Sequence, residues 1–229
     1  QLIATAATRP GRCLEIGAGR GTKTYVMMCQ AKRAGYDRQH TALDLHDRKC
    51  DQNLARLHKA GITGVRTVSG DACELNEVLT SFDAMLGKPV LFDTVFIDAP
   101  CSGTGTMRRH PEIPWRLTEK DVTTDLPKLQ LTMLKEAAAR VAAGGELIYA
   151  TCSVFDEENA QVVDAFLASP ECAGFTVAPL SEAQILQLPE FAQAKKLVTV
   201  RQNDRGLFQS VPVNADSYDG HFCARLVHK

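Results

Sequence analysis

The chain has 229 residues, the usual size of one large domain or two small ones. Hydrophobic residues make up 45% and charged residues 23%, and this ordinary globular composition excludes a disordered chain. Lys and Arg total 26 against 27 Asp and Glu. The net charge of -1 excludes a protein that holds nucleic acid by overall charge alone, although a local basic patch stays possible. No apolar run approaches the roughly 18 residues that a membrane helix needs, so we expect a soluble protein without membrane contact.

Eight cysteines, at positions 13, 29, 50, 73, 101, 152, 172 and 223, are many for this length. No two form a C-x-x-C pair, and no histidine cluster accompanies them at zinc-ligand spacing, so we expect no metal. A chain of this length buries a core without disulfides, which favours reduced thiols and a cytoplasmic protein. Most of the thiols should be small buried hydrophobes.

Short apolar runs alternate with helical periods along most of the chain. Strands are predicted over residues 12–16, 40–44, 64–69, 91–97 and 146–151. Helices are predicted from the first glycine-rich turn to about residue 34, and over 47–59, 75–86, 118–142 (with a break at Pro127) and 156–168. Strands separated by helices of about 10–15 residues indicate right-handed βαβ units. The pattern therefore predicts an α/β fold with a mostly parallel, doubly wound sheet.

The last part of the chain changes character. Shorter strands are predicted over residues 175–178, 197–200 and 221–227, with irregular connections between them. These segments should add antiparallel edge strands to the sheet. We find no internal repeat, no low-complexity tract and no interdomain linker, so residues 1–229 are expected to form one domain.

A glycine-rich turn follows the first predicted strand. It comprises Glu15, Gly17, Ala18, Gly19, Arg20, Gly21, Thr22 and Lys23. Glycines at alternate positions let the backbone approach a ligand at the carboxyl edge of a parallel sheet. The spacing matches neither a Walker P-loop nor the G-x-G-x-x-G dinucleotide fingerprint, and the preceding acid fits an amine-bearing ligand better than a pyrophosphate. A plain tight turn is the alternative.

Two further acids follow strands. Asp44 ends the second strand, where a carboxylate can accept both hydroxyls of a ribose. Asp71 follows the third strand and is expected to accept from an adenine amino group, although a helix N-cap is the simpler reading of either acid. Together with the glycine-rich turn they describe a site for an adenosine without phosphates, and we therefore expect S-adenosylmethionine as the cofactor.

Two cysteines follow the fourth and fifth strands. Cys101 stands in Asp98-Ala99-Pro100-Cys101, and Cys152 follows Thr151 directly after its strand. Both should lie at the same sheet edge as the glycine-rich turn, in polar segments where a thiol can be reached. Cys152 also precedes a helix whose N-terminus favours the thiolate. Burial without function is the alternative for any single cysteine.

These segments resemble the RNA cytosine-5 methyltransferases of the NOL1/NOP2/Sun family, to which bacterial ribosomal-RNA enzymes belong. The resemblance rests on Asp98-Ala-Pro-Cys-Ser-Gly-Thr-Gly, Arg108-Arg-His-Pro-Glu-Ile-Pro-Trp-Arg, Gly144-Gly-Glu-Leu-Ile-Tyr-Ala-Thr-Cys-Ser, Glu157-Glu-Asn and Asp219-Gly-His-Phe-Cys-Ala-Arg-Leu. It covers nearly the whole chain and implies a Rossmann-like class I methyltransferase fold. In the first motif the chain departs from the family's Asp-x-Cys-Ala-Ala-Pro-Gly-Gly-Lys-Thr, but Lys23 is retained. Whether Arg48 or Lys49 fills the family's basic position after Asp44 is open.

The resemblance implies the roles in the reaction. Cys152 attacks carbon 6 of the cytosine, and Cys101 assists removal of the carbon 5 proton and release of the product. Asp98 is the natural partner of N3, because a carboxyl can share a proton with the base there. On chemistry alone either thiol could be the nucleophile.

Ribosomal RNA is the expected substrate, with transfer RNA as an alternative. Another methyltransferase class would act on protein, a small molecule or N6 of adenine, and a non-catalytic RNA-binding assembly factor would keep the fold without the reaction. Family members normally carry an RNA-binding segment before this domain, whereas this chain opens at Gln1 and has its first methionine at position 27. We therefore expect a fragment or processed product that binds RNA weakly by itself, and a monomer.

Residues 108–120 form a locally basic segment. Arg108, Arg109, Arg116 and Lys120 outnumber the acids there, and Trp115 lies among them. Such a segment could contact phosphates and stack a base that is flipped out of structured RNA. A solvated loop with a packed indole is the equally weighted alternative.

Overall fold

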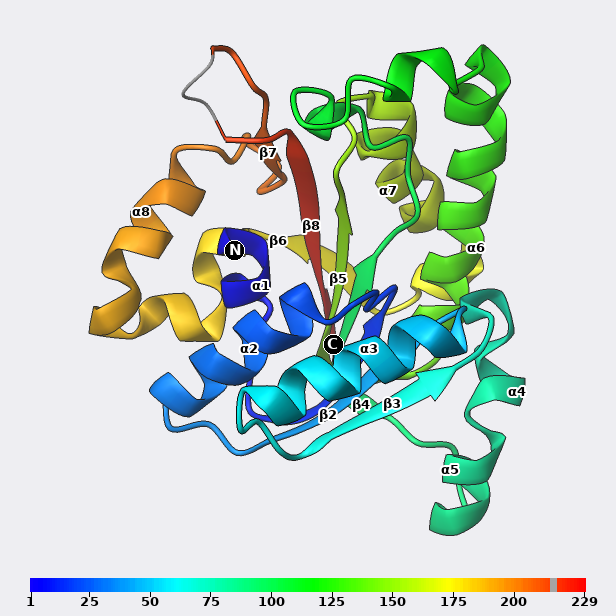
Figure 1. Cartoon of the computed structure of the whole chain (residues 1–229), viewed down its shortest axis with the longest axis vertical. Coiled ribbons are helices and arrows are strands. Elements are labelled where there is room, and N and C mark those ends of the chain that lie inside the picture. Colours follow the sequence, from blue (N-terminus) through cyan, green and yellow to red (C-terminus); the bar gives the residue numbers. More distant parts are fainter. Residues whose placement is uncertain (215–217) are drawn as a thin grey trace.

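The computed structural model describes residues 1–214 and 218–229 (Figure 1). Its strands are β1 (Gly11–Ile16), β2 (Arg38–Asp44), β3 (Val65–Ser69), β4 (Phe92–Asp98), β5 (Val141–Thr151), β6 (Phe175–Ala178), β7 (Phe208–Ser210) and β8 (His221–His228). They form an eight-stranded sheet with the order β3-β2-β1-β4-β5-β8-β6, and β7 pairs with β8 off this path. β1 to β5 are mutually parallel, whereas β8 runs antiparallel to β5, β6 and β7.

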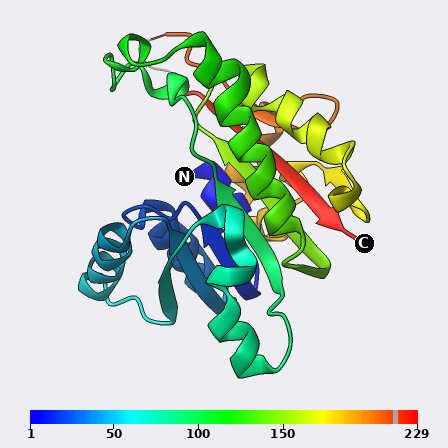
Figure 2. The ribbon, with the colours of Figure 1, turned by 90° about the vertical axis from the view of Figure 1, so that its right-hand side faces the viewer.

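Helices cover both faces of the sheet (Figure 2). They are α1 (Leu2–Ala6), α2 (Thr22–Arg33), α3 (Asp47–Lys59), α4 (Leu75–Val78), α5 (Thr80–Leu86), α6 (Leu126–Ala138), α7 (Ala160–Leu167) and α8 (Ala192–Thr199). Buried side chains of α4, α6 and α7 belong to one hydrophobic cluster, and those of α1, α2 and α8 belong to another. The result is the three-layer arrangement that a buried parallel sheet requires.

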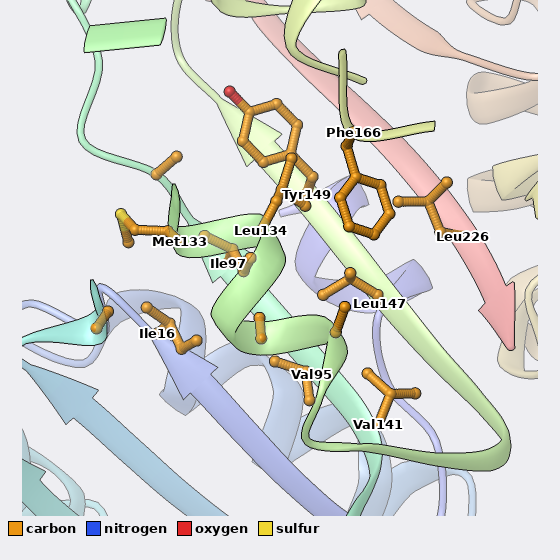
Figure 3. Close-up of a cluster of buried hydrophobic side chains, with 14 of the residues drawn as sticks. Ile16, Val95, Ile97, Met133, Leu134, Val141, Leu147, Tyr149, Phe166 and Leu226 are labelled. Atoms are coloured by element: carbon orange, nitrogen blue, oxygen red, sulfur yellow. The ribbon is translucent and has the colours of Figure 1, made fainter. Parts of the chain in front are cut away.

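Successive residues of the central strands point to opposite layers. In β4, Val95 and Ile97 enter the cluster under α6, whereas Phe96 enters the cluster under α2. Tyr149 of β5 packs in the first cluster with Leu134 and other labelled side chains in Figure 3. Because both faces are covered, the central strands are apolar almost throughout, which is why their sequences lack simple alternation.

The predicted fold class is confirmed by this topology. The five predicted parallel strands occur as β1 to β5, and the predicted strands over 175–178 and 221–227 occur as β6 and β8. Of the antiparallel strands, β8 lies between β5 and β6, so it is an inner strand and not the edge strand that was expected.

The predicted strand over 197–200 is wrong. These residues belong mainly to α8, which ends at Thr199. The run of branched residues favours a strand locally, but Val198 is buried in the same cluster as Ile3 and Phe191 while Val200 is 68% exposed. Tertiary packing of one helical face therefore overrides local β-propensity. The antiparallel strand is formed instead by β7.

Two predicted helices differ in their bounds. The helix over 118–142 consists of a π-helical turn at Asp121–Asp125 followed by α6, with Pro127 in the first turn of α6. The helical run therefore continues through Pro127, which lies next to the change from π-helix to α-helix. The chain then enters β5 at Val141. The helix over 75–86 is divided into α4 and α5.

The carboxyl ends of the parallel strands meet at one edge of the sheet. Asp98, the last residue of β4, is in register with Ala150 of β5. The segments that follow β1, β2, β4 and β5 therefore converge there, where ligands bind in open α/β sheets. Within residues 1–214 and 218–229, no helix combines the length and apolar character that crossing a membrane requires.

Candidate active site

The glycine-rich loop after β1 lies against β4 and α3. Gly17 has φ 75°, and a Cβ there would stand 2.3 Å from the carbonyl oxygen of Asp98. Gly21 has φ 78°, and its Cβ would stand 2.0 Å from Oδ1 of Asn53 on α3. Only glycine fits either position, because the left-handed backbone and the close approach both exclude a side chain. The loop backbone is thereby held at the carboxyl edge of the sheet.

The other predicted loop residues differ in exposure. Ala18 is buried, and its N–H donates to the carbonyl of Leu43 at 3.0 Å. Arg20 is exposed. Thr22 begins α2, and its hydroxyl accepts a hydrogen bond from Arg56 at 2.9 Å. Gly17 and Gly19 are half-buried, and Arg20 and Thr22 are exposed, so parts of the loop remain accessible.

Asp44 ends β2 directly beside this loop and is buried. Its Oδ2 accepts the N–H of Gly19 at 2.9 Å, and its Oδ1 accepts the N–H of His46 at 3.1 Å. The Nζ of Lys49 lies 3.3 Å from Oδ1, so Lys49 is the cation paired with this carboxylate. A buried carboxylate with two oxygens and about four acceptor positions retains capacity for ligand hydroxyls.

Glu15 lies beneath the loop and not in it. Its side chain is fully buried, and its Oε2 accepts a hydrogen bond from Thr24 at 2.6 Å and lies 2.8 Å from Nε2 of His40. The carboxylate that sequence reasoning assigned to a ligand is therefore directed into the layer between the sheet and α2. Its position suits support of the loop.

Asp71 follows β3 and is exposed. Its Oδ1 accepts the N–H of Cys73 at 2.8 Å, which caps the short 3-10 helix Ala72–Glu74. This is the N-cap that was the simpler reading of the sequence. The remaining carboxylate oxygen leaves room for a second acceptor role.

Asp98 and Lys23 form an ion pair at the edge of the sheet. The Nζ of Lys23 lies 2.5 Å from Oδ2 of Asp98. Burial raises the pKa of the Asp98 carboxyl above its ordinary value, although Lys23 opposes the shift. Burial would lower the pKa of Lys23, but the attraction of Asp98 outweighs it and the pKa is raised. A raised pKa makes this carboxyl easier to protonate than an ordinary aspartate.

Cys101 and Cys152 meet beside this pair. Their sulfur atoms are 3.3 Å apart, and the N–H of Cys152 donates to Sγ of Cys101 at 3.3 Å. Their hydrogen bond lowers the pKa of Cys152 and raises that of Cys101, and the charge of Lys23 also favours the Cys152 thiolate. Either sulfur could donate in this contact, and the direction of the two pKa shifts favours Cys101 as the donor and Cys152 as the more acidic thiol.

A cavity of about 310 Å³ opens at these groups. Its lining includes Lys23, Asp98, Cys101, Cys152 and His221. His221 was not singled out from the sequence, although it stands in the quoted segment that begins at Asp219. Its Nδ1 is hydrogen-bonded to the carbonyl of Gly220, and burial together with Lys23 lowers the pKa of the imidazole to about 4. The ring is therefore neutral at neutral pH.

The described parts of the chain contain no group of three or more His, Cys, Asp or Glu side chains arranged to hold a metal ion. A larger cavity of about 480 Å³, lined among others by Arg12, Val65 and Phe82, contains neither thiol of the site. The acid-base and nucleophilic groups are thus gathered in the smaller cavity.

The basic segment lies above the cysteine-bearing loops. Trp115 is 89% exposed, so its indole is not packed. Arg109 pairs with Asp219 at 2.6 Å, and Arg116 pairs with Glu112 at 3.0 Å. The exposed indole provides a flat surface on which a base could stack, and arginines lie on either side of it in the sequence. Aromatic and basic side chains of this kind are typical of surfaces that contact single-stranded nucleic acid.

Solved structures share this architecture. A crystal structure of PH0851 superposes with a TM-score of 0.77 and 26% identity, covering 99% of this chain and 45% of that one. The structure of NSun6 from Pyrococcus horikoshii with SFG has a TM-score of 0.73 and 18% identity, covering 99% of this chain and 51% of that one. The fold is therefore that of the Rossmann-like methyltransferases.

The family is shown by sequence. The family described as 16S rRNA methyltransferase RsmB/F matches residues 4–227, and the chain belongs to this family. The ribosomal RNA small subunit methyltransferase B of Citrobacter koseri is 49% identical over 156 residues, which is 68% of this chain and 33% of that protein. The match thus spans about a third of the length of that relative. The resemblance read from the sequence motifs is confirmed.

Proposed function

We propose that the protein transfers a methyl group from S-adenosylmethionine to carbon 5 of a cytosine in RNA, with ribosomal RNA as the substrate. The observation that carries this proposal is the pair of sulfur atoms 3.3 Å apart beside the Lys23–Asp98 ion pair, in one cavity at the carboxyl edge of the sheet. A single activated thiol would suffice for many reactions. Two unequal thiols and a carboxyl of raised pKa fit a reaction that both forms and resolves a covalent bond.

The cofactor would be held by the loop and the acids around it. The backbone of Gly17–Gly21 would accommodate the ligand, Asp44 would accept from the ribose hydroxyls, and Asp71 would accept from the adenine amino group. The open loop backbone and the carboxylate bonded to Gly19 fit a ligand without phosphates. When bound, S-adenosylmethionine supplies an electrophilic methyl group. Family membership and the name of the Citrobacter koseri relative support this assignment and the RNA substrate.

The first step is bond formation by Cys152. Carbon 5 of cytosine is a weak nucleophile, and addition of the Cys152 thiolate to carbon 6 makes it electron-rich. The electron pair displaced toward N3 needs a proton, and Asp98 in its protonated form would donate one, since burial makes this carboxyl easier to protonate than an ordinary aspartate. Lys23 then remains beside the Asp98 carboxylate and stabilises its negative charge.

The second step uses Cys101. Bond formation consumes the negative charge of Cys152, whose hydrogen bond is the first cause of the raised Cys101 pKa. Cys101 can then lose its proton to water in the cavity, and the resulting thiolate accepts the proton from carbon 5 after methyl transfer, so that one proton is released per methyl group. The bond between carbon 6 and Cys152 breaks, its electron pair returns to the sulfur, and the proton on N3 returns to Asp98. The two thiols thus act in sequence because each controls the pKa of the other.

Alanine variants of the two cysteines test this order of events. Cys152→Ala should abolish turnover and form no covalent adduct, because the first bond is never made. Cys101→Ala should form that bond but fail to break it, so a protein–RNA complex that survives denaturation should accumulate with cofactor present. The measurement is gel electrophoresis after incubation with cytosine-containing RNA, and Cys29→Ala, a partly buried thiol of α2, serves as the control.

Each other outcome would reject part of the proposal. An adduct in Cys152→Ala and none in Cys101→Ala would exchange the roles of the thiols. Loss of stability by roughly 1–3 kcal/mol in both variants, without adduct in either, would identify a structural pair. Bisulfite sequencing of the product names the methylated nucleotide, and methylation of transfer RNA alone would reject the ribosomal substrate.

A further inference from the structure

The two cysteine-bearing loops share a buried carboxylate. Glu158, in the 3-10 helix Asp156–Glu158, is fully buried. Its Oε1 accepts the backbone N–H of Ser102 at 2.8 Å, and its Oε2 accepts the hydroxyl of Ser153 at 2.5 Å. Each serine directly follows one of the two cysteines. A single side chain is therefore bonded to both loops next to the sulfur-bearing residues.

Further hydrogen bonds join the same loops. The hydroxyl of Ser102 donates to the hydroxyl oxygen of Ser153 at 3.1 Å. The amide nitrogen of Gln130 on α6 donates to Oε1 of Glu158 at 3.1 Å and to the carbonyl of Pro100 at 2.9 Å. The loops leave different strands and are 51 residues apart in sequence, so local backbone geometry cannot set the distance between them.

Stability alone does not account for this carboxylate. Burial of a polar or charged side chain costs free energy that its hydrogen bonds offset, and apolar side chains of the same volume often serve stability as well. An apolar side chain, however, could not hold two loops by directed bonds. The bonds of Glu158 thus point to control of geometry at the neighbouring cysteines.

We propose that Glu158 is a positioning residue that sets the separation of the Cys101 and Cys152 sulfur atoms. Because Glu158 is fully buried, it acts through the two loops and has no contact with substrate. Its effect on turnover rests on the proposed function, whereas its effect on the thiols can be measured without RNA.

Loss of the Glu158 carboxylate should raise the pKa of Cys152. Without the common acceptor, the loops separate and the hydrogen bond from Cys101 weakens. Since that bond is the first cause of the lowered Cys152 pKa, Cys152 then needs a higher pH to ionise. The titratable groups that face Cys152, and that every variant below keeps, are Cys101, Asp98, Lys23 and His221.

Two substitutions at Glu158 test the proposal. Glu158→Gln keeps the shape and one acceptor oxygen, but its NH2 group cannot accept the Ser153 hydroxyl. Glu158→Ala removes both acceptors. The rate of Cys152 alkylation by iodoacetamide is followed against pH by mass spectrometry, and its midpoint should rise by about 0.5 pH unit or more in both variants. For RNA methylation, kcat should fall about 10-fold in Glu158→Gln and about 100-fold in Glu158→Ala, with KM within about twofold.

A stability control separates positioning from general damage. Val163→Ala on α7 removes a fully buried side chain outside the hydrogen-bonded loops and should leave the alkylation midpoint unchanged. If Glu158→Ala does not fold, the variant Ser153→Ala is used in its place. This substitution removes the hydroxyl that donates to Oε2 of Glu158.

Unchanged midpoints in Glu158→Gln and Ser153→Ala would overturn the proposal, as would an equal rise in Val163→Ala. A wild-type protein that methylates no RNA would refute the proposed function, and the alkylation midpoints would still decide the role of Glu158.

Discussion

Two buried carboxylates near the glycine-rich loop have different surroundings. Asp44 is bonded to the N–H groups of Gly19 and His46 at the edge of the sheet, where a ligand can approach. Glu15 is bonded to Thr24 and His40 inside the molecule. Both are carboxylates at or next to the carboxyl end of a strand, and they differ in the direction of the side chain.

Asp44 provides the residue-scale prediction. Asp44→Ala should weaken binding of S-adenosylmethionine at least tenfold, because a buried charged acceptor of the ribose hydroxyls is lost, and such hydrogen bonds contribute roughly 1.5–3 kcal/mol. Isothermal titration calorimetry measures the affinity. Asp47→Ala, an exposed acid in the first turn of α3, is the matched control and should bind normally. Unchanged affinity in Asp44→Ala would refute the ribose assignment.

At the scale of elements, α3 determines how closely the loop can lie against its neighbours. Asn53 of α3 donates to Thr24 of α2 at 3.2 Å, and its Oδ1 occupies the space that a side chain at position 21 would need. The glycine, the asparagine and the threonine thus form one contact between loop, α2 and α3. Together they hold the loop in place.

The contact predicts non-additive stability changes. Gly21→Ala should lower the free energy of unfolding by roughly 1–3 kcal/mol, because the backbone is left-handed and the new Cβ meets Asn53. Asn53→Ala should relieve the clash, so the double variant should lose less stability than the sum of the single variants. Urea unfolding of the three variants measures the coupling. Additivity within about 0.5 kcal/mol would show that the asparagine gives way freely.

Local patterns predicted most elements because their causes are local. Apolar runs bounded by turn residues marked β1 to β5, and helical periodicity marked the region of α6. The segment over 197–200 was the failure, since Val198 is helical only through its packing with the N-terminal helix and the turns before α8. The four residues 197–200 alone carry no pattern that indicates this packing of Val198.

On the scale of the whole molecule, a polar network lies in the layer between the sheet and α2. Arg38 donates to the sulfur of Cys13 at 2.7 Å and to Nδ1 of His40 at 3.2 Å, and His40 is in turn paired with Glu15. Burial would lower the pKa of His40, but Cys13 and Glu15 raise it to about 9. The raised pKa favours the protonated imidazole over the neutral one, and protonation at Nδ1 would replace the hydrogen bond accepted from Arg38.

This network predicts how stability depends on pH. The folded-state pKa of His40 lies above its unfolded value of about 6.5, so its contribution is complete below pH 6.5 and is lost as the pH rises through about 9. Urea unfolding at pH 6.5 and pH 9 should show a loss of roughly 1–3 kcal/mol. His40→Gln should lower stability at pH 6.5 and flatten the dependence. An equal loss between the two pH values in the variant would assign the effect to other groups.

The sequence by itself determined the parallel sheet, the glycine-rich loop and the family, because hydrophobic periodicity and short motifs act over a few neighbouring residues. It also brought Asp98, Cys101 and Cys152 to one edge, since parallel strands end together. Only the tertiary structure decided which thiol is the more acidic, where Glu15 points and that Glu158 joins both loops. These properties depend on distances between residues far apart in the chain, and such distances arise only when the layers pack.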